Sequence, residues 1–410
     1  MNNDKKVCNF YFQIKNNDFR IYTVLLASYE KKGTFKTINT QELFSLPIRY
    51  EMMKGYDAND EGLLQYFNDF YKWNGQLFLE IKNSGIDAFT YSYNNKMAVI
   101  KTFKKHCNKK IYNLEKNTCI VDAVESFYFE NCFNGGLTCC LNGTYECYGY
   151  DYNSFYPRIL GDMKFADFLI PLNAGKKVKL EHLIKEEIQY GFYNVKITCT
   201  NESFLKIFKF CKKNIYTHYS LLFAFKHQEE FNIKIELLHE YDHYLYDQND
   251  LISSREIFGV WFDKLIAIKT KYPQNKLIKH LMSSLWGFLA EFNTLSVTED
   301  EIHKFDCGLI NDDCEYYIKD KCKTEGNCYY TLMKKDNMYK YDLRLKPFLL
   351  SYARNVLGDI AYNNNLDEII RIYVDNIVYK SNVKFEVENM VLEKKTTGHI
   401  TWHNNRQMEV

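Results

Sequence analysis

The sequence predicts an α+β fold, and three segments support this prediction. Residues 7–30 contain two runs of apolar and aromatic residues with the polar triplet NND between them, which is typical of two strands and a turn. Residues 255–292 show helical periodicity with a break at Tyr272-Pro273, which predicts two helices in a hairpin. Residues 369–380 (IIRIYVDNIVYK) have the density of β-branched residues expected for two strands that meet at a central polar pair.

The remaining elements show the same two patterns. Further strands are expected at 145–152 and 191–199, and further helices at 119–131 and 347–362. The densest basic run, KTFKKHCNKK at 101–110, precedes the helix at 119–131 and Gly135-Gly136, so we expect a domain junction within 115–135. The sequence contains no internal repeat and no low-complexity linker.

Composition limits the class of protein. With 410 residues, 46% of them hydrophobic, the chain is long enough for two or three domains that each bury a core. The 53 Lys plus Arg and 52 Asp plus Glu neither favour nor exclude a polyanionic partner, so only local clusters of charge are informative. The 13 cysteines lack regular short spacings, which favours reduced thiols in an intracellular setting, in the cytoplasm or at a replication site. No signal-peptide pattern and no run of about eighteen apolar residues occurs, so we expect neither export nor a membrane span.

The segment YGYDYNSFYPR at 148–158 places an acidic residue at the end of a strand, directly before a turn. Asp151 ends the strand, Asn153 and Ser154 form the turn, and Tyr156 precedes a proline. The segment resembles the first palm motif of the family B DNA polymerases, DxxSLYP. The resemblance implies that Asp151 is a metal ligand assisted by the carbonyl of Tyr152, and that Tyr156 lies beneath the incoming sugar, where it would collide with a 2′-hydroxyl. It implies a nucleotide site formed by Tyr152, Asn153, Ser154, Phe155 and Tyr156.

The segment KLIKHLMSSLWGFLA at 276–290 is a second candidate for chemistry. Helical spacing puts five residues on or near one face: Lys276, Lys279, Ser283, Trp286 and Gly287. The segment resembles the fingers-helix motif KxxxNSxYG, which implies that Lys279 is catalytic, offsetting charge on the leaving pyrophosphate, and that Lys276, Ser283 and Trp286 bind the nucleotide. Ser283 stands where the motif has Asn and Trp286 where it has Tyr, so nucleotide affinity or fidelity is expected to differ.

The segment RIYVDNIVY at 371–379 resembles the strand-turn-strand motif DTDS of the same family. Two carboxylates from separate strands are needed to hold the two divalent cations of phosphoryl transfer. We align Asp375 with the second carboxylate and Asn376 with the Ser, which leaves Tyr373 at the position of the first carboxylate. In an alternative register Asp375 is the first carboxylate and Ile377 stands at the second, which would leave the main metal site incomplete.

Three further segments match the family in the expected order. FNGG at 133–136 resembles the YxGG motif of protein-primed members, which implies contacts of Phe133, Gly135 and Gly136 with the template. The helix PFLLSYARNVLGDIA resembles the palm helix that precedes the last metal motif. Lys395 and Thr396 stand where a KxY motif contacts the primer, although Thr397 replaces the aromatic residue. The resemblance covers residues 130–400.

The resemblance implies a right-hand polymerase with palm, fingers and thumb. The expected domains are a degenerate exonuclease-like α/β domain at 1–125, palm and fingers at 126–380 with the fingers at about 255–292, and a thumb remnant at 381–410. In the family, an exonuclease begins with DxE on a strand, but YFQIK at 11–15 has Gln13 and Lys15 there. IKNSGIDAF at 81–89 resembles the second exonuclease motif and retains Asn83 and Asp87. We therefore expect no proofreading.

Two long connections and a cysteine cluster complete the sequence-based interpretation. Free cysteines in a surface hairpin are favoured over a structural zinc ion, because no CxxC pair occurs among Cys307, Cys314, Cys322 and Cys328. By the resemblance, residues 291–345 are a candidate for the insertion that wraps the template, and the connection from Pro157 to about residue 250 for the insertion that receives a priming protein.

The sequence therefore predicts a family B DNA polymerase of the protein-primed type. The expected partners are template and primer DNA, deoxynucleoside triphosphates and a terminal priming protein, and the expected cofactor is Mg²⁺ or Mn²⁺, two ions. Two alternatives remain open: a catalytically silent polymerase-like scaffold that binds nucleic acid, and a template-independent nucleotidyltransferase.

Overall fold

The computed structural model describes most of the chain beyond residue 94 and three strands before it. The described residues are 7–15, 18–27, 43–49, 95–112, 120–273, 276–309, 312–324, 327–341, 343–382, 387–402 and 408–409. Contacts between residues divide the chain into two compact units. The first contains residues 1–113 and 257–288, and the second contains residues 114–256 and 289–410.

The first unit contains a small sheet and a group of helices. The antiparallel sheet has the order β2-β1-β3, from Val7–Lys15 (β1), Asp18–Ala27 (β2) and Leu43–Arg49 (β3). The helices are Asn95–His106 (α2), Ser254–Lys271 (α7), whose residues from Ile257 on belong to this unit, Lys276–Ser283 (α8) and Leu285–Leu289 (α9). Phe103 of α2 stacks on Phe258 of α7 at 4.9 Å between ring centroids, which anchors the two helices to each other.

The helical hairpin predicted at 255–292 is confirmed with one addition. Helix α7 ends shortly before Pro273, as expected. A second interruption of the helical structure occurs at Ser284, so α8 and α9 are separate helices. The Ser283 hydroxyl donates to the carbonyl of Lys279 at 2.7 Å, and the Ser284 hydroxyl lies 3.0 Å from Nδ1 of His280. Serine side chains that bond to the preceding turn in this way compete with the helical backbone and bend it.

The largest sheet of the second unit is six-stranded and antiparallel. Its strands are Thr138–Cys140 (β4), Gly143–Tyr152 (β5), Ile369–Tyr373 (β17), Asn376–Tyr379 (β18), Met390–Trp402 (β19) and Met408–Glu409 (β20). The spatial order is β20-β19-β5-β18-β17-β4. Strands from 138–152 and strands from 369–409 are therefore interleaved in this sheet. Strand β19, in the segment expected to be a thumb remnant, pairs with β5.

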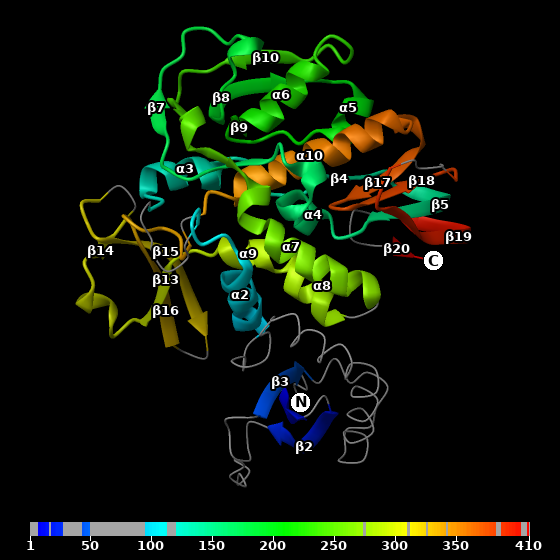
Figure 1. The fold of residues 1–410 in the computed structure, drawn as a ribbon. Coiled ribbons are helices and arrows are strands. Elements are labelled where there is room, and N and C mark those ends of the chain that lie inside the picture. Colours follow the sequence, from blue (N-terminus) through cyan, green and yellow to red (C-terminus); the bar gives the residue numbers. More distant parts are fainter. Residues whose placement is uncertain are drawn as a thin grey trace. The chain divides into compact units, whose positions relative to one another are not determined.

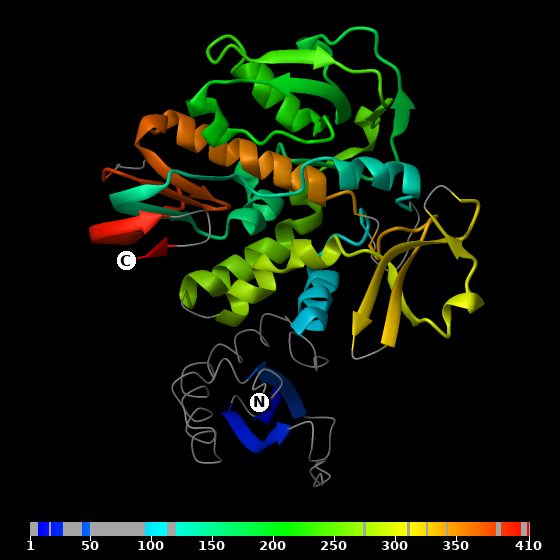
Figure 2. The same ribbon diagram turned by 180° about the vertical axis from the view of Figure 1, so that it is seen from behind.

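Helix α10 (Lys346–Asn363) lies along this sheet in both ribbon views (Figures 1 and 2). It begins with a proline in its first turn, where the missing N–H has no intrahelical partner to lose. Ile372 and Ile377, on one face of the sheet, are both 0% exposed, whereas Asp151, Tyr373 and Asn376 on the opposite face are partly exposed. The part of the second face that contains these three residues is therefore partly exposed to solvent.

A second layer packs on the other side of α10. Its sheet has the order β10-β8-β11-β7, with β9 paired to β8. The strands are Lys176–Val178 (β7), Gly191–Thr198 (β8), Ile215–Thr217 (β9), Lys234–Leu237 (β10) and His243–Leu245 (β11). Helices Glu202–Ile207 (α5) and His218–Lys226 (α6) contact α10, so α10 is held between this layer and the six-stranded sheet (Figure 1).

The remaining elements of the second unit are short or peripheral. Helices Ala123–Asn131 (α3) and Phe155–Gly161 (α4) flank strands β4 and β5 in sequence. A two-stranded sheet pairs Leu169–Pro171 (β6) with Leu251–Ser253 (β12). A four-stranded sheet, in the order β13-β16-β15-β14, contains Thr294–Thr298 (β13), Cys307–Gly308 (β14), Tyr316–Thr324 (β15) and Asn327–Lys334 (β16). Single 3₁₀ turns occur at Met163–Phe165 (η3), Lys185–Glu187 (η4), Gln248–Asp250 (η5), Ile302–Lys304 (η6) and Leu366–Glu368 (η7).

Most elements predicted from sequence patterns are confirmed where the structure describes them. The two strands within 7–30 are β1 and β2, and the two within 369–380 are β17 and β18. The helix expected at 347–362 is α10, and that expected at 119–131 is the shorter α3. The segment 81–89, with Asn83 and Asp87, lies outside the described residues.

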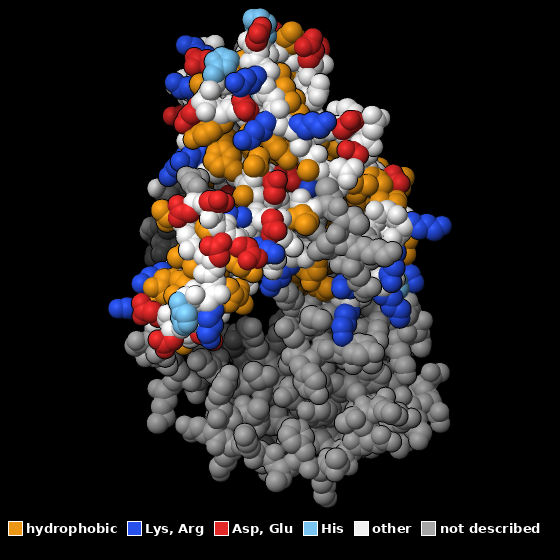
Figure 3. Space-filling view, turned by 90° about the vertical axis from the view of Figure 1, so that its left-hand side faces the viewer, with side chains coloured by type: hydrophobic (Ala, Val, Ile, Leu, Met, Phe, Trp, Pro, Cys, Tyr) orange, Lys and Arg blue, Asp and Glu red, His pale blue; other side chains and the backbone are white. Residues whose placement is uncertain are grey.

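The described surface has no dominant charge on the face that Figure 3 presents, because acidic and basic side chains are intermixed there. Attraction of a polyanion to such a surface has to come from local groups rather than from net charge. Within the described residues, no helix combines the length and the apolar character needed to span a membrane.

Candidate functional site

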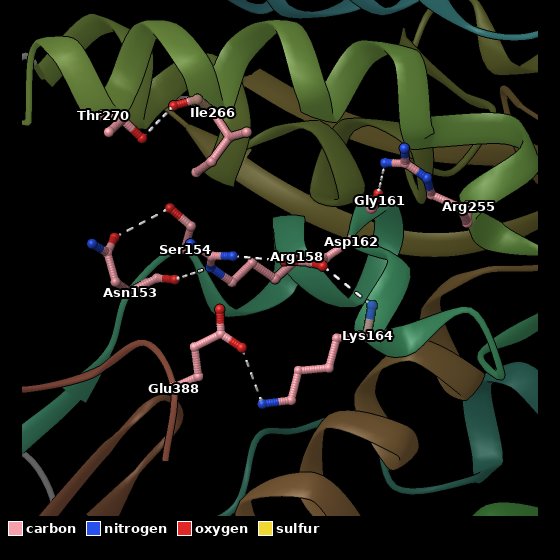
Figure 4. Close-up of polar contacts among 10 residues, drawn as sticks. All are labelled: Asn153, Ser154, Arg158, Gly161, Asp162, Lys164, Arg255, Ile266, Thr270 and Glu388. Atoms are coloured by element: carbon pink, nitrogen blue, oxygen red, sulfur yellow. Dashed lines mark hydrogen bonds and ion pairs between the residues drawn. The ribbon is translucent and has the colours of Figure 1, made fainter. Parts of the chain in front are cut away.

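The turn after β5 fixes the position of Asp151. Ser154 adopts the left-handed conformation (φ 59°, ψ 40°), which reverses the chain between β5 and α4. Arg158, one turn into α4, donates from Nε to the carbonyl of Asn153 at 3.0 Å and from Nη1 to Oδ2 of Asp162 at 2.6 Å (Figure 4). The turn is therefore held by a charged side chain from the helix that follows it.

A second set of contacts joins this turn to the segment before β19. The amide of Asn153 donates to the carbonyl of Asn389 at 3.0 Å, and Lys164 lies 3.8 Å from Glu388 (Figure 4). Arg255, at the start of α7, also donates to the carbonyl of Gly161. Contacts with the segment before β19 and with Arg255 therefore stabilise the region that follows β5, and all of them lie within the second unit.

The hairpin between β17 and β18 presents Asp375. Tyr373 pairs with Asn376, and the two turn residues between them are Val374 and Asp375. Val374 has φ 65°, a left-handed conformation that a β-branched residue adopts only under steric strain. Its amide donates to the carbonyl of Leu137 at 2.9 Å, so the loop before β4 holds the turn in place.

The backbones of Asp151 and Asp375 lie at adjacent strand ends. Asp151 pairs with Asn376, the residue after Asp375, and the amide of Tyr152 donates to the carbonyl of Asp375 at 2.8 Å. Both aspartates are partly exposed. Carboxylate oxygens are the type of ligand that Mg²⁺ or Mn²⁺ prefers.

Strand register also defines a row of residues across the open face. The row runs Val391, Asp151, Asn376, Tyr373 and Thr138, from β19 to β4. Tyr373, which stands where a first carboxylate was expected, therefore lies on the same face as Asp151, two strands away. Ile377, the position of the second carboxylate in the alternative register, is 0% exposed and lies on the opposite face.

Arg354 of α10 links three of the predicted segments. It donates from Nη1 to the carbonyls of Gly135 at 2.6 Å and Phe133 at 3.2 Å, and its guanidinium lies 5.0 Å from the centroid of the Phe133 ring. Burial lowers the pKa of Arg354 to about 10. Burial raises the pKa of Tyr156, with Asp375 raising it further and Arg354 lowering it, so these three side chains are neighbours.

The sequence pattern does not distinguish Arg354 from the other residues of the helix expected at 347–362. A single arginine in an amphipathic helix has the pattern of a surface residue, yet this one is 7% exposed. Only the packing of α10 against the glycine loop and α4 makes Arg354 part of the site.

Comparison with known proteins supports this arrangement at the level of the fold. No family model and no curated protein matches the sequence. A solved structure of phi29 DNA polymerase complexed with primer-template DNA and incoming nucleotide substrates matches with a TM-score of 0.55 and 15% identity over 86% of this chain. The chain resembles phi29 DNA polymerase in fold.

The extent of the match sets its limits. The chain covers 61% of the phi29 DNA polymerase chain. A second structure of that enzyme, complexed with single-stranded DNA, matches with a TM-score of 0.49 and 14% identity over 81% of this chain and 54% of the other. At these identities the likeness to phi29 DNA polymerase is one of fold and assigns no role to any residue.

The predicted nucleotide contacts of 276–290 lie in the first unit. Lys279 and Ser283 are exposed on α8, Lys276 begins that helix, and Trp286 is partly exposed on α9. A Cβ added at Gly287 would meet nothing within 4 Å, so the helix surface beside Trp286 is open. Such a face is accessible to a flat or an anionic ligand.

The remaining predicted residues lie on strands. Lys395 and Thr396 belong to β19, opposite Tyr148 and Cys147 of β5. Gly136 packs closely under the hairpin turn, since a Cβ there would lie 3.2 Å from Cγ2 of Val374. Gln13 and Lys15 belong to β1.

The four clustered cysteines lie in and around the four-stranded sheet. Cys307 is in β14, Cys314 precedes β15, exposed Cys322 is in β15 and buried Cys328 is in β16. Within the described residues, no group of three or more His, Cys, Asp or Glu side chains is arranged to hold a metal ion.

Proposed function

We propose that this chain is a template-directed DNA polymerase of family B that extends a 3′-hydroxyl by two-metal phosphoryl transfer. The observation that supports this most directly is the convergence of Asp151 and Asp375, which lie beside each other through the β5–β18 pairing and the 2.8 Å bond from Tyr152 to Asp375. The fold-level likeness to phi29 DNA polymerase, whose solved complexes contain primer-template DNA and nucleotides, agrees with the proposal.

In this proposal Asp151, Asp375 and the carbonyl of Tyr152 hold two Mg²⁺ or Mn²⁺ ions. The residues present fit such ions, because hard divalent cations prefer carboxylate and carbonyl oxygens and keep some water. When bound, the ions polarise the triphosphate and lower the pKa of the 3′-hydroxyl. The protein's own contribution is to keep both carboxylates fixed at the ends of paired strands.

The turn after β5 would form the sugar pocket. Tyr156 is partly exposed, and the charges of Asp375 and Arg354 both act on the pKa of its hydroxyl, which agrees with the proposed position beneath the sugar. Phe155 is 2% exposed and packs on Tyr152 at 4.9 Å, so we assign these two side chains to support of the turn. Asn153 and Ser154, at the tip of the turn, are left to contact the nucleotide.

The other assignments follow from the resemblance of their sequence motifs to those of the family. Lys279 would offset charge on the leaving pyrophosphate, and Lys276, Ser283 and Trp286 would contact the triphosphate and base. Phe133, Gly135 and Gly136 would contact the template, and Lys395 and Thr396 the primer. Arg354, which holds the carbonyls of Phe133 and Gly135, acts as a positioning residue in this scheme.

We further propose that priming is by a protein and that the enzyme does not proofread. The connection from Pro157 to about residue 250 contains the layer with α5 and α6, which is a candidate receiver for a priming protein. Two-metal hydrolysis of a 3′ end needs several carboxylates. Gln13 and Lys15 supply none, and an ammonium group repels the cations that such a pocket must concentrate.

Two alternatives have support from particular residues. Tyr373 and Ser283 replace side chains that the family uses in chemistry, which favours a silent nucleic-acid-binding scaffold. A metal site alone would also serve template-independent nucleotide transfer. Extension that depends on template would exclude both alternatives, whereas extension without template would indicate nucleotide transfer alone.

The decisive experiment is primer extension with all four deoxynucleotides and Mg²⁺ or Mn²⁺, with and without template. Asp375→Asn, which keeps size and removes charge, is the matched control for contaminating polymerase. Equal extension by the wild type and Asp375→Asn would contradict the proposal. Incubation of a mismatched primer without nucleotides tests proofreading, and we expect no shortening of its 3′ end.

A further inference from the structure

Arg371 and Tyr373 form a stacked pair on the open face of the six-stranded sheet. The guanidinium carbon of Arg371 lies 4.6 Å from the centroid of the Tyr373 ring, and both side chains are partly exposed. The two residues are separated by one position on β17 and so project from the same face. That face also carries Asp151, because Tyr373 and Asp151 belong to the same cross-strand row. The guanidinium of Arg371 therefore lies beside Tyr373, the residue at the position where a first carboxylate was expected.

The cross-strand row next to Asp151 joins Arg371 to a position on β19. Arg371 pairs with Val378 of β18, Val378 with Gly149 of β5, and Gly149 with Lys394 of β19. Gly149 and Val378 are both buried, and Val378 packs in a cluster with Cys147 and Ile370. A cationic residue stands on either side of this buried stretch, Arg371 on β17 and Lys394 on β19.

The chemistry of the pair fits a phosphate diester. A guanidinium offers paired N–H donors that match two phosphate oxygens, and stacking on an aromatic ring orients it with less loss of side-chain entropy. When the last nucleotide of a nucleic-acid strand lies over Asp151 and Asp375, the phosphate that precedes it lies about one nucleotide farther along the sheet. Adjacent strands are about 4.8 Å apart, which places β17 about 10 Å from β5 and within reach of an arginine side chain.

We propose that Arg371, oriented by Tyr373, binds a phosphate of the nucleic-acid strand whose 3′ end lies over Asp151 and Asp375. This inference rests on the proposed function, because it takes that strand as the substrate. The pair replaces a metal-binding carboxylate with a phosphate-binding cation. Part of the positioning that a second acidic ligand would provide through a metal is then provided directly by the protein.

The proposal predicts opposite effects on two ligands. Removing the guanidinium takes away one phosphate contact and should weaken nucleic-acid binding. The same change removes a positive charge about 10 Å from the carboxylates and should strengthen binding of a divalent cation. A merely structural role for Arg371 would weaken both, since a disordered hairpin holds neither ligand.

The first measurement is fluorescence anisotropy of a labelled primer-template duplex without metal, at several salt concentrations. For Arg371→Gln we expect about tenfold weaker binding, and a slope of log affinity against log salt reduced by about one. Arg371→Lys should keep the wild-type slope but bind more weakly, because an ammonium cannot stack or bind in a bidentate manner.

The second measurement is Mn²⁺ binding by electron paramagnetic resonance of the free ion, without nucleic acid. For Arg371→Gln we expect binding about two- to fourfold tighter than wild type. The control is Lys380→Gln. Lys380 also lies over an aromatic ring, 5.8 Å from the centroid of Tyr145, but follows β18 at the end away from Asp375. Lys380→Gln should change neither the duplex affinity nor the Mn²⁺ affinity by more than about twofold.

The outcomes separate this inference from the proposed function. Wild-type duplex affinity and salt slope in Arg371→Gln would overturn the phosphate contact even if the enzyme extends primers. Weakened duplex binding together with tighter Mn²⁺ binding would support it even if extension fails. Absence of duplex binding by the wild type would overturn this inference along with the nucleic-acid partner on which it rests.

Discussion

Two groups of carboxylates in the second unit differ in their surroundings, and the difference separates structural acids from candidate catalytic acids. Glu125 is 0% exposed and accepts from Nε of Arg344 at 2.6 Å, from Nη2 at 2.7 Å and from the hydroxyl of Tyr246 at 2.6 Å. Asp151 and Asp375 are instead partly exposed at the ends of paired strands. Glu125 is paired with a guanidinium in the core, whereas the two aspartates are partly exposed to solvent.

The ion pair between Glu125 and Arg344 offsets an energetic cost of burial. Burial raises the pKa of Glu125 and the contact with Arg344 opposes this rise, so the ion pair offsets the cost of placing an acid in the core. Arg344 also donates to the carbonyl of Ile120 at 3.1 Å, which ties the residues before α3 to those before α10. We therefore expect substitutions at Glu125 to affect stability and substitutions at the aspartates to affect activity.

The largest effect is expected at the aspartates. Asp151→Asn and Asp375→Asn each remove charge from the proposed metal site without changing side-chain size. Loss of either ligand should slow primer extension by on the order of a thousandfold or more, which corresponds to several kcal/mol of transition-state stabilisation. The free energy of unfolding in urea should change by less than about 1 kcal/mol, because both side chains are partly exposed. Near wild-type extension by either variant would remove this pair from consideration.

The buried ion pair should show the reverse pattern. Arg344→Met leaves the Glu125 carboxylate without its cation and should lower the free energy of unfolding by about 3–5 kcal/mol. Glu125→Gln combined with Arg344→Met should recover part of this loss, because no uncompensated charge remains buried. The measurement is urea unfolding, and extension by the remaining folded protein should stay within a few-fold of wild type. A thousandfold loss of activity in Arg344→Met, with the fold intact, would contradict the distinction between structural and candidate catalytic carboxylates.

The sequence indicates candidate site residues where they lie in short continuous motifs. Asp151 and Asp375 each follow a strand pattern and each belong to a turn with recognisable chemistry, so their strands and their order along the chain could be inferred. The structure adds that β5 and β18 are neighbours, with Asp151 opposite Asn376. This pairing joins residues more than two hundred positions apart, which no local pattern specifies.

Residues that act through packing could not be predicted. Asp122 and Glu125 have the spacing of a helix capping box, and the side chain of Asp122 does accept from the amide of Glu125 at 2.8 Å. The Glu125 carboxylate, however, turns inward to Arg344, 219 positions away in sequence. Arg354 is a similar case, since its partners Phe133 and Gly135 come from a loop before β4. Charged residues in helices have surface patterns, and only the assembled core reveals which are buried.

A smaller effect is expected at Tyr156. Its ring lies near Asp375 and is proposed to sit beneath the sugar of the incoming nucleotide. Tyr156→Ala should raise incorporation of ribonucleotides relative to deoxynucleotides by about tenfold or more, because a pocket that excludes one small group by contact discriminates by about 1–3 kcal/mol. The measurement is the ratio of kcat/KM for each nucleotide pair. Tyr156→Phe keeps the ring and should keep the ratio, and an unchanged ratio in active Tyr156→Ala would place the discrimination elsewhere.

The smallest effect concerns the strained turn that presents Asp375. A β-branched residue at φ 65° costs on the order of 1–3 kcal/mol, and glycine removes this cost while adding about 0.5–1 kcal/mol of backbone entropy in the unfolded chain. Val374→Gly should therefore stabilise the fold by about 1 kcal/mol in urea unfolding. Val378→Gly is the matched control, because Val378 is 4% exposed in β18, and that change should destabilise by a few kcal/mol.

The activity of Val374→Gly then tests what the strain is for. If the strained turn fixes the Asp375 carboxylate against Asp151, a more stable but more mobile turn should extend primers more slowly, by about tenfold. Val374→Asn tolerates the left-handed conformation without the mobility of glycine and should retain most of the activity. Stabilisation with full activity in Val374→Gly would mean that the β5–β18 pairing alone holds the carboxylates. The strain would then have no part in positioning them.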